Sequence, residues 1–219
     1  MRLAVSAVLF DMDGVLVNSK AVIERVLRRW AARRGLAPSA VAGLPHGQKT
    51  SDAIRNVAPH LNVREEVAWL DAEEERDLAG ITEITGAAKL TGALAPGEWA
   101  LVTSAGRDLA AMRLKAAHVP LPAKIVSGES VKRGKPDPEG YLLGAQLLGR
   151  TPQECVVLED APAGIAAGIA AGMRVIGVAS TFDRARLARL GCITIVDDLS
   201  EITVARTGHE LALVLPSRD

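Results

Sequence analysis

The fold of this 219-residue chain is constrained most by a series of short, continuous apolar runs, each followed by a segment with helical periodicity. The runs expected to form strands are Ala4–Phe10, Trp99–Thr103, Ile125–Ser127, Val156–Leu158 and Val175–Val178, with Thr194–Val196 expected at an edge. Helices are expected at Arg107–Ala117, Pro138–Leu148, Ala163–Ala171 and Arg184–Leu190. Strands that are apolar throughout are typical of sheets covered by helices on both faces. The alternation therefore predicts an α/β fold with a doubly wound parallel sheet.

The stretch from Ser19 to Ala79 interrupts this alternation, because it contains no convincing strand. Its charged residues recur with helical spacing in Glu24–Trp30 and in Val63–Leu78, and we interpret these charged runs as solvated helix faces. We expect residues 17–83 to form a small α-helical cap domain inserted after the first strand. Residues 1–16 and 84–219 would then form the Rossmann-like core.

The composition excludes several classes of protein. Lysine and arginine number 26, as do aspartate and glutamate, so the chain has no net charge and no basic excess to bind nucleic acid or an anionic membrane. No apolar run approaches the roughly 20 residues of a membrane span. Met1–Phe10 is interpreted as a buried strand rather than a signal peptide, because Asp11 follows directly. Two isolated cysteines make neither a disulfide framework nor a zinc cluster. We expect a cytoplasmic monomer.

Polar residues follow the apolar runs at the positions where an open α/β sheet binds its ligands, beyond the carboxyl ends of the strands. These residues are Asp11, Asp13, Thr103, Ser104, Lys135, Glu159 and Asp160. Several carboxylates in one site repel one another unless a cation neutralises them, and oxygen ligands favour Mg²⁺. Carboxylates beside a lysine and hydroxyl donors predict a phosphate site bridged by a metal ion.

The segments that carry these residues resemble the four motifs of the haloacid dehalogenase-like (HAD) hydrolase superfamily. In chain order they are Asp11–Ser19, Val102–Ser104, Gly134–Pro136 and Leu158–Asp160. The chain is most similar to small-molecule phosphatases of this superfamily that have a helical cap after the first strand. The resemblance extends over nearly the whole chain, and the four motifs together are highly specific. It implies a HAD-type phosphatase.

The resemblance also implies the chemical roles of the first motif. Asp11 corresponds to the nucleophile, which forms an aspartyl-phosphate intermediate. Asp13 corresponds to the general acid and base, and it shares a face of the extended chain with Asp11 because the two residues are two positions apart. Gly14 allows a tight turn and a close approach of substrate to the backbone.

The remaining motif residues are expected to hold the metal ion and the phosphoryl group. By resemblance, the metal ligands are the carboxylates of Asp11 and Asp160 and the main-chain carbonyl of Asp13, and Glu159 either adds a further carboxylate ligand or holds a metal-bound water. The phosphoryl group would be held by Ser104, the backbone of Ala105, and Lys135. The cofactor implied by this set is Mg²⁺.

The segment Leu44–Ile54 resembles a cap loop of the glycerol-phosphate and 2-deoxyglucose-6-phosphate phosphatases, in which a His-Gly pair and a basic residue lie over the active site. His46 and Lys49 are therefore expected to bind substrate, and a small sugar or polyol phosphate is the implied substrate. Lys49 stands where that subgroup usually has arginine, so one ammonium contact would replace a bidentate one.

Alternative functions stay open beside the expected Mg²⁺-dependent phosphomonoesterase. A phosphosugar mutase similar to β-phosphoglucomutase shares the four motifs and the cap, but it must protect its phosphorylated intermediate from water. A catalytically idle member kept for binding is disfavoured because Asp11, Asp13, Lys135 and Asp160 are all intact. A dehalogenase is disfavoured because the second acid and the metal-binding carboxylates are present.

Overall fold

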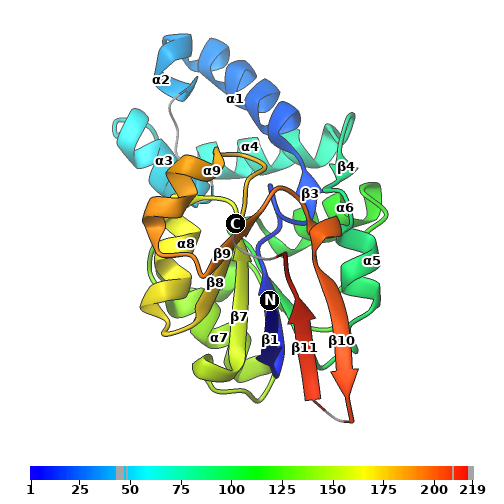
Figure 1. Ribbon diagram of the computed structural model, residues 1–219. Helices are drawn as coiled ribbons and strands as arrows, with labels where there is room; N and C mark the ends of the chain where they lie inside the picture. Colours follow the sequence, from blue (N-terminus) through cyan, green and yellow to red (C-terminus); the bar gives the residue numbers. More distant parts are fainter. Residues whose placement is uncertain (43–46, 48, 209, 217–219) are drawn as a thin grey trace.

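The centre of the molecule is a six-stranded parallel sheet with the strand order β6-β5-β2-β7-β8-β9 (Figure 1). The computed structural model describes residues 1–42, 47, 49–208 and 210–216. The strands are β2 (Ala7–Phe10), β5 (Trp99–Val102), β6 (Ile125–Val126), β7 (Cys155–Glu159), β8 (Arg174–Val178) and β9 (Thr194–Val196). The predicted parallel sheet is confirmed, and β9 lies at its edge as expected.

Helices cover both faces of this sheet (Figure 1). One face carries α5 (Ala87–Gly92) and α6 (Arg107–Ala116), and the other carries α7 (Glu139–Leu147) and α8 (Pro162–Ala170). Every residue of β2 is buried, because Val8 and Phe10 pack into the core on the α6 side while Ala7 and Leu9 pack into the core on the α7 side. This two-sided burial explains the continuous apolar runs and confirms the doubly wound α/β fold.

The last predicted helix is shorter than expected. It consists of α9 (Arg184–Leu187), which continues as a 3₁₀ turn over Ala188–Leu190. Across the described part of the chain, no helix combines the length and apolar character that crossing a membrane requires.

The first apolar run forms two strands rather than one. β1 (Arg2–Val5) leaves the central sheet and pairs antiparallel with β11 (Glu210–Val214), which pairs in turn with β10 (Thr203–Thr207). The break falls at Ser6, whose backbone N–H donates to the carbonyl of Glu154. The expected single strand Ala4–Phe10 is therefore wrong, and the antiparallel sheet that β1 joins was not predicted.

The insertion after the first central strand is helical, as expected. It contains α1 (Lys20–Arg34), α2 (Pro38–Ala42), α3 (Thr50–Val57) and α4 (Val63–Arg76), which we call the cap. The chain leaves the core through β3 (Val17–Asn18) and returns through β4 (Thr82–Glu83), and these two strands pair antiparallel. The cap lies over the carboxyl ends of the central strands (Figure 1). The division into domains at residues 17 and 83 remains a prediction.

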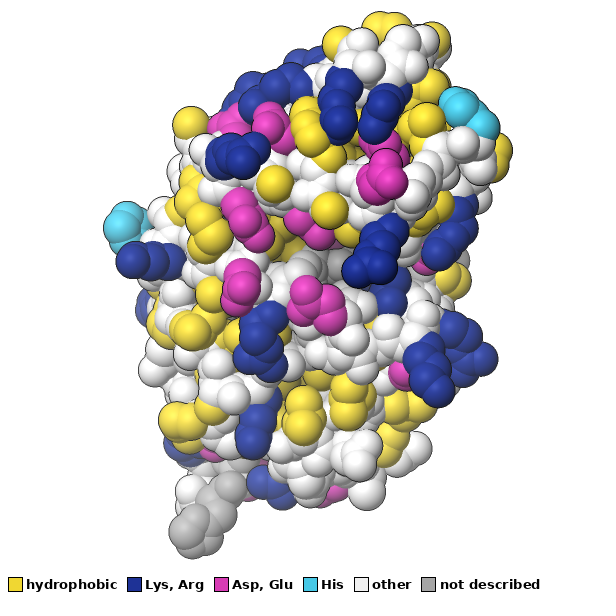
Figure 2. All heavy atoms as spheres, turned by 180° about the vertical axis from the view of Figure 1, so that it is seen from behind, with side chains coloured by type: hydrophobic (Ala, Val, Ile, Leu, Met, Phe, Trp, Pro, Cys, Tyr) yellow, Lys and Arg dark blue, Asp and Glu magenta, His cyan; other side chains and the backbone are white. Residues whose placement is uncertain are grey.

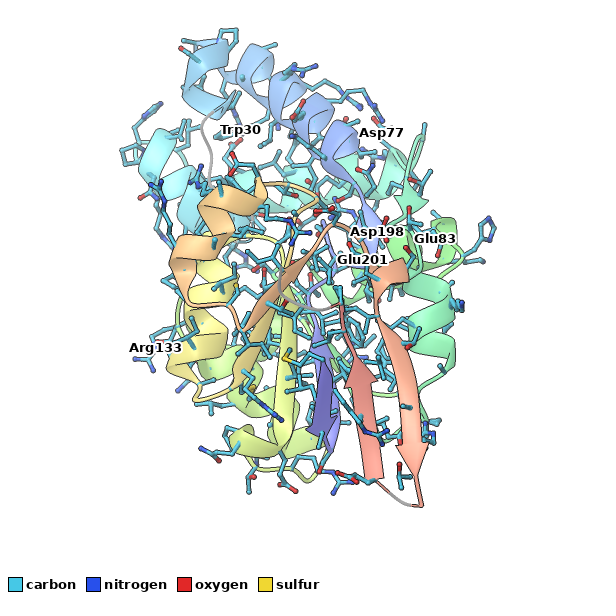
Figure 3. All side chains as sticks on the ribbon, in the orientation of Figure 1. Trp30, Asp77, Glu83, Arg133, Asp198 and Glu201 are labelled. Atoms are coloured by element: carbon cyan, nitrogen blue, oxygen red, sulfur yellow. The ribbon has the colours of Figure 1, made fainter. Side chains whose placement is uncertain are left out.

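Two polar clusters join α1 to α4 and to Asp77, which directly follows α4. Figure 3 labels one residue of each cluster, Trp30 and Asp77. In the first, the Trp30 indole donates to Glu66 over 2.7 Å, and Arg34 pairs with the same carboxylate. In the second, Asp77 accepts two hydrogen bonds from Arg25, at 2.6 and 2.8 Å, and pairs with Arg29. The interpretation of the charged runs as solvated faces is wrong for Glu66, which is only 1% exposed.

Candidate active site

A cavity of about 170 Å³ lies between the carboxyl ends of the central strands and the cap. Its core side includes the predicted site residues Asp11, Asp13, Gly14, Ser104, Ala105 and Asp160. The parallel pairing of β2 with β5 and β7 brings the ends of these strands together, and so collects residues that lie far apart in the sequence. The cap closes the opposite side with residues of α1, α3 and α4.

Lys135 does not line this cavity but is bound beside it, between the buried carboxylates of Asp11 and Glu159. Its Nζ atom donates to Asp11 Oδ1 and to Glu159 Oε1, each over 2.6 Å. The Tyr141 hydroxyl donates to the same Glu159 oxygen over 2.8 Å, and the other oxygen accepts from the backbone N–H groups of Asp160 and Ala161. Glu159 is fully buried and accepts four hydrogen bonds, so it fixes the position of Lys135 beside Asp11.

Burial and mutual repulsion dominate the electrostatics of the carboxylates. Burial raises the pKa of Asp11 to about 7, with the charge of Glu159 adding to the rise and that of Lys135 opposing it. Burial and the charge of Glu159 raise the pKa of Asp160 well above its usual range. Burial alone would lower the pKa of Lys135, but Asp11 and Glu159 raise it above its usual value, so the ammonium stays charged.

The donor set fits a hard cation. One oxygen from each of Asp11, Glu159 and Asp160 lies within 4.8 Å of the others. Asp160 is 1% exposed, and its Oδ1 atom has no hydrogen-bond partner among the described residues. A buried carboxylate oxygen without a partner is costly unless a ligand satisfies it, and an oxygen ligand set of this kind suits a divalent cation. Asp160 thus offers a free ligand atom, whereas both Glu159 oxygens already accept hydrogen bonds.

Gly14 is required where the chain turns away from the first motif. Its φ of +86° lies in the left-handed region, and a Cβ atom there would stand 2.0 Å from Asp160 Oδ2. The absence of a side chain therefore lets the backbone pass directly against the candidate cation ligand.

Arg113 holds Asp13 from the side of α6. Its Nη1 atom lies 2.9 Å from both carboxylate oxygens of Asp13, and the Ser19 hydroxyl donates to Oδ1 of the same group over 2.5 Å. Arg113 was not among the predicted site residues. One indication was present in the sequence, because Arg113 falls at helical spacing on the same face as the apolar residues Leu109 and Ala110, and an arginine on a buried helix face needs a partner.

The remaining predicted residues differ in their placement. The Ser104 hydroxyl reaches the cavity but donates to the Gly47 carbonyl of the cap over 2.8 Å. The Ala105 backbone N–H donates to the Thr103 hydroxyl over 3.1 Å. Lys49 donates to the Val131 carbonyl over 2.7 Å and does not line this cavity. His46 lies outside the described residues.

Residues 5–172 match the haloacid dehalogenase-like hydrolase family. The chain belongs to this family. The match spans most of the chain, so the expected assignment to a HAD-type hydrolase is confirmed.

Similar proteins include named phosphatases. The chain is 43% identical over 203 residues to hexitol phosphatase A of Escherichia coli, covering 90% of this chain and 93% of that protein. It is 36% identical over 222 residues to glycerol-1-phosphate phosphohydrolase 1 of Saccharomyces cerevisiae, covering 96% of this chain and 89% of that protein. Among solved structures, CbbY from Rhodobacter sphaeroides in complex with phosphate has the same fold, with a TM-score of 0.80, 22% identity and coverage of 90% and 96%.

Proposed function

We propose that this protein is a Mg²⁺-dependent phosphomonoesterase that hydrolyses a small sugar or polyol phosphate through an aspartyl-phosphate intermediate. One observation carries the proposal: Asp11 is held 2.6 Å from a charged lysine, next to a buried Asp160 oxygen that has no protein partner among the described residues. A carboxylate nucleophile beside two sources of positive charge is the arrangement that phosphoryl transfer needs. The sugar and polyol class is supported by the names of the hexitol and glycerol-1-phosphate phosphatases.

The chain's own groups would carry both chemical steps. The Asp11 carboxylate attacks phosphorus, the bond from phosphorus to the alcohol oxygen breaks, and the Asp13 carboxyl gives its proton to the leaving alkoxide. A water molecule then attacks phosphorus, the ionised Asp13 takes a proton from it, and the bond to Asp11 breaks. Both carboxylates return to their starting states, and inorganic phosphate leaves.

The positive charge in the site has two sources. The Lys135 ammonium neutralises the phosphoryl oxygens beside Asp11. Asp11, Glu159, Asp160 and the main-chain carbonyl of Asp13 would hold the Mg²⁺ ion, which supplies further positive charge to those oxygens when it is bound. We propose that the Ser104 hydroxyl exchanges its bond to Gly47 for one to the phosphoryl group when substrate enters. We further propose that the protein acts as a monomer in the cytoplasm.

Phosphate release from a panel of monophosphates tests this function. The panel contains hexitol, hexose, glycerol and nucleotide monophosphates, each assayed with Mg²⁺ and with EDTA. We expect Mg²⁺-dependent release from hexitol or glycerol phosphates, without isomerisation of a sugar phosphate. Conversion of β-glucose 1-phosphate to glucose 6-phosphate with a bisphosphate primer, without net phosphate release, would instead identify a mutase. A folded protein that turns over no member of the panel would contradict the proposal.

A further inference from the structure

The cap side of the cavity carries two carboxylates on one face of α4. Asp71 and Glu74 lie three positions apart, nearly one helical turn, and both line the cavity that also holds Asp11. The cavity surface around them is largely apolar, with Ile23 and Leu27 from α1 and Ile84 from the segment after β4. A group bound at Asp11 and extending toward the cap would meet a mostly apolar wall with two carboxyl groups in it.

The two carboxylates are differently constrained. Glu74 Oε2 accepts from Arg113 Nη2 over 3.0 Å, and Arg113 is itself only 2% exposed. Arg113 therefore ties the cap carboxylate to the same guanidinium that holds Asp13. The carboxylate of Asp71 has no hydrogen-bond partner within the described part of the chain, although the residue is half-buried. The Nε atom of Arg113 is buried and likewise has no partner among those residues. The cavity is thus lined by one carboxylate, that of Asp71, whose hydrogen-bonding capacity the described residues do not use.

Asp71 and Glu74, on the cap side of the cavity, favour binding of an uncharged group there over binding of an anion in addition to the phosphoryl group. Burial raises the pKa of Asp71 to about 6, with the charge of Glu75 adding to the rise. Burial also raises the pKa of Glu74 to about 7, against the lowering effect of Arg113. Figure 2 shows acidic side chains gathered around a hollow between the cap and the core on this side of the molecule. The exposed residue Lys20 also lines the cap side of the cavity and carries a positive charge.

From this geometry we propose that Asp71 and Glu74 are specificity-determining residues that bind hydroxyl groups of a polyol leaving group. This inference rests on the proposed phosphatase function and names the feature of the alcohol that the cap recognises. Each hydroxyl can donate to a carboxylate oxygen and accept from a protonated carboxyl, and the apolar surface around them contacts the carbon chain. The cavity accordingly selects uncharged polyhydroxy alcohols.

A matched pair of substrates tests the inference. Glycerol 1-phosphate and propyl phosphate have the same carbon chain and similarly poor leaving groups, but only the first has free hydroxyls. We expect the wild-type protein to favour glycerol 1-phosphate in kcat/KM by tenfold or more, and Asp71→Leu to lower this ratio by about tenfold. Asp71→Asn, which still donates and accepts hydrogen bonds, should retain most of the ratio. Glu74→Met gives a second test with the same expected fall.

The control variant is Glu65→Leu, because Glu65 is exposed on the same helix and does not line the cavity. It should leave the substrate ratio at the wild-type value. A ratio that stays unchanged in both Asp71→Leu and Glu74→Met, while the wild-type protein releases phosphate from both alkyl phosphates, would overturn this inference alone. A wild-type protein that releases phosphate from neither substrate with Mg²⁺ would overturn the phosphatase function, and this inference with it.

Discussion

The Nη1 atom of Arg113 lies 2.9 Å from both carboxylate oxygens of Asp13, so a buried guanidinium holds the side chain proposed to protonate the leaving group. The same side chain reaches Glu74 of the cap through Nη2. Asp13 is therefore fixed by the core helix α6 and is linked to the cap through one residue. Arg113 contacts no atom of the reacting phosphoryl group in the proposed chemistry, so it acts as a positioning residue.

Replacement of Arg113 should affect poor leaving groups most. Proton donation matters for an alkoxide but little for p-nitrophenolate, and a positioned general acid contributes roughly 10²–10⁴-fold. We expect Arg113→Met to lower kcat for propyl phosphate about 100-fold while p-nitrophenyl phosphate loses much less, and Arg113→Lys to recover part of the loss. Steady-state kinetics on both substrates measures this difference. Equal losses on the two substrates would show that Arg113 has only a structural role.

Asp11→Asn should abolish turnover without unfolding the protein. An amide is a very poor nucleophile, and the substitution also removes the ion pair with Lys135, which now spans 2.6 Å. We expect no detectable phosphate release with Mg²⁺, together with an unchanged circular dichroism spectrum. Near-normal activity of this variant would mean that the reaction does not pass through a covalent bond to Asp11.

Gly164→Ala should disturb the site by displacing the Glu159 carboxylate. Gly164 lies in α8, and a Cβ atom at this position would stand 1.6 Å from Glu159 Oε1, the oxygen that binds Lys135. Because Glu159 is fully buried, its carboxylate cannot simply turn into solvent. We expect kcat/KM to fall and the free energy of unfolding to drop by about 1–3 kcal/mol, as in other overpacked cores.

Gly92→Ala is the matched control for this substitution, because Gly92 lies at the end of α5 and a Cβ atom there would have no neighbour within 4 Å. It should leave kcat/KM and stability close to the wild-type values. Chemical denaturation and phosphate-release assays on both variants make the comparison. If Gly164→Ala matched Gly92→Ala in both measurements, the contact between α8 and Glu159 would not support the site.

The central site could be predicted because its residues follow local rules. Asp11, Lys135 and Asp160 each stand just after an apolar run or just before a helix, and parallel strands bring such positions to one edge of the sheet. Asp11 and Asp160 accordingly line the cavity, and Lys135 binds Asp11 beside it. The three hydrogen bonds of Arg113 follow from no local rule, because they join α6 to the first motif and to α4 across long distances in the chain.

Two errors have the same physical origin. Glu66 and Glu74 stand in charged helical runs, and helical periodicity alone does not show which charged face packs against another element. The division of the first apolar run at Ser6 depends on β11, which lies more than 200 residues later and pairs with β1. Both features are set by tertiary contacts, which a local pattern does not contain.

The sequence and the structure predict different effects for the replacement of Lys49. The cap-loop resemblance predicts that Lys49 contacts the leaving group directly, so Lys49→Ala would change the order in which the enzyme prefers its substrates. In the structure its ammonium donates to the Val131 carbonyl, which ties the cap to the loop before Lys135. We therefore expect Lys49→Ala to raise KM by a similar factor, several-fold, for glycerol 1-phosphate and p-nitrophenyl phosphate. A change in ranking between the two substrates would favour the direct contact.

Glu66 should stabilise the cap in a pH-dependent way. Burial alone would raise its pKa, but hydrogen bonds from Arg34 and Trp30 outweigh this effect and lower the pKa below the ordinary value of 4.5. The resulting stabilisation is complete above pH 4.5 and is lost as the pH falls through the lowered pKa. We expect Glu66→Ala to reduce the free energy of unfolding by about 3 kcal/mol at pH 7, because Arg34 and the Trp30 indole lose their partner. Glu65→Ala, at an exposed position, should change it by less than about 0.5 kcal/mol. Urea denaturation at pH 7 and at pH 3 measures both effects, and a deficit of Glu66→Ala that did not shrink at the lower pH would contradict this assignment.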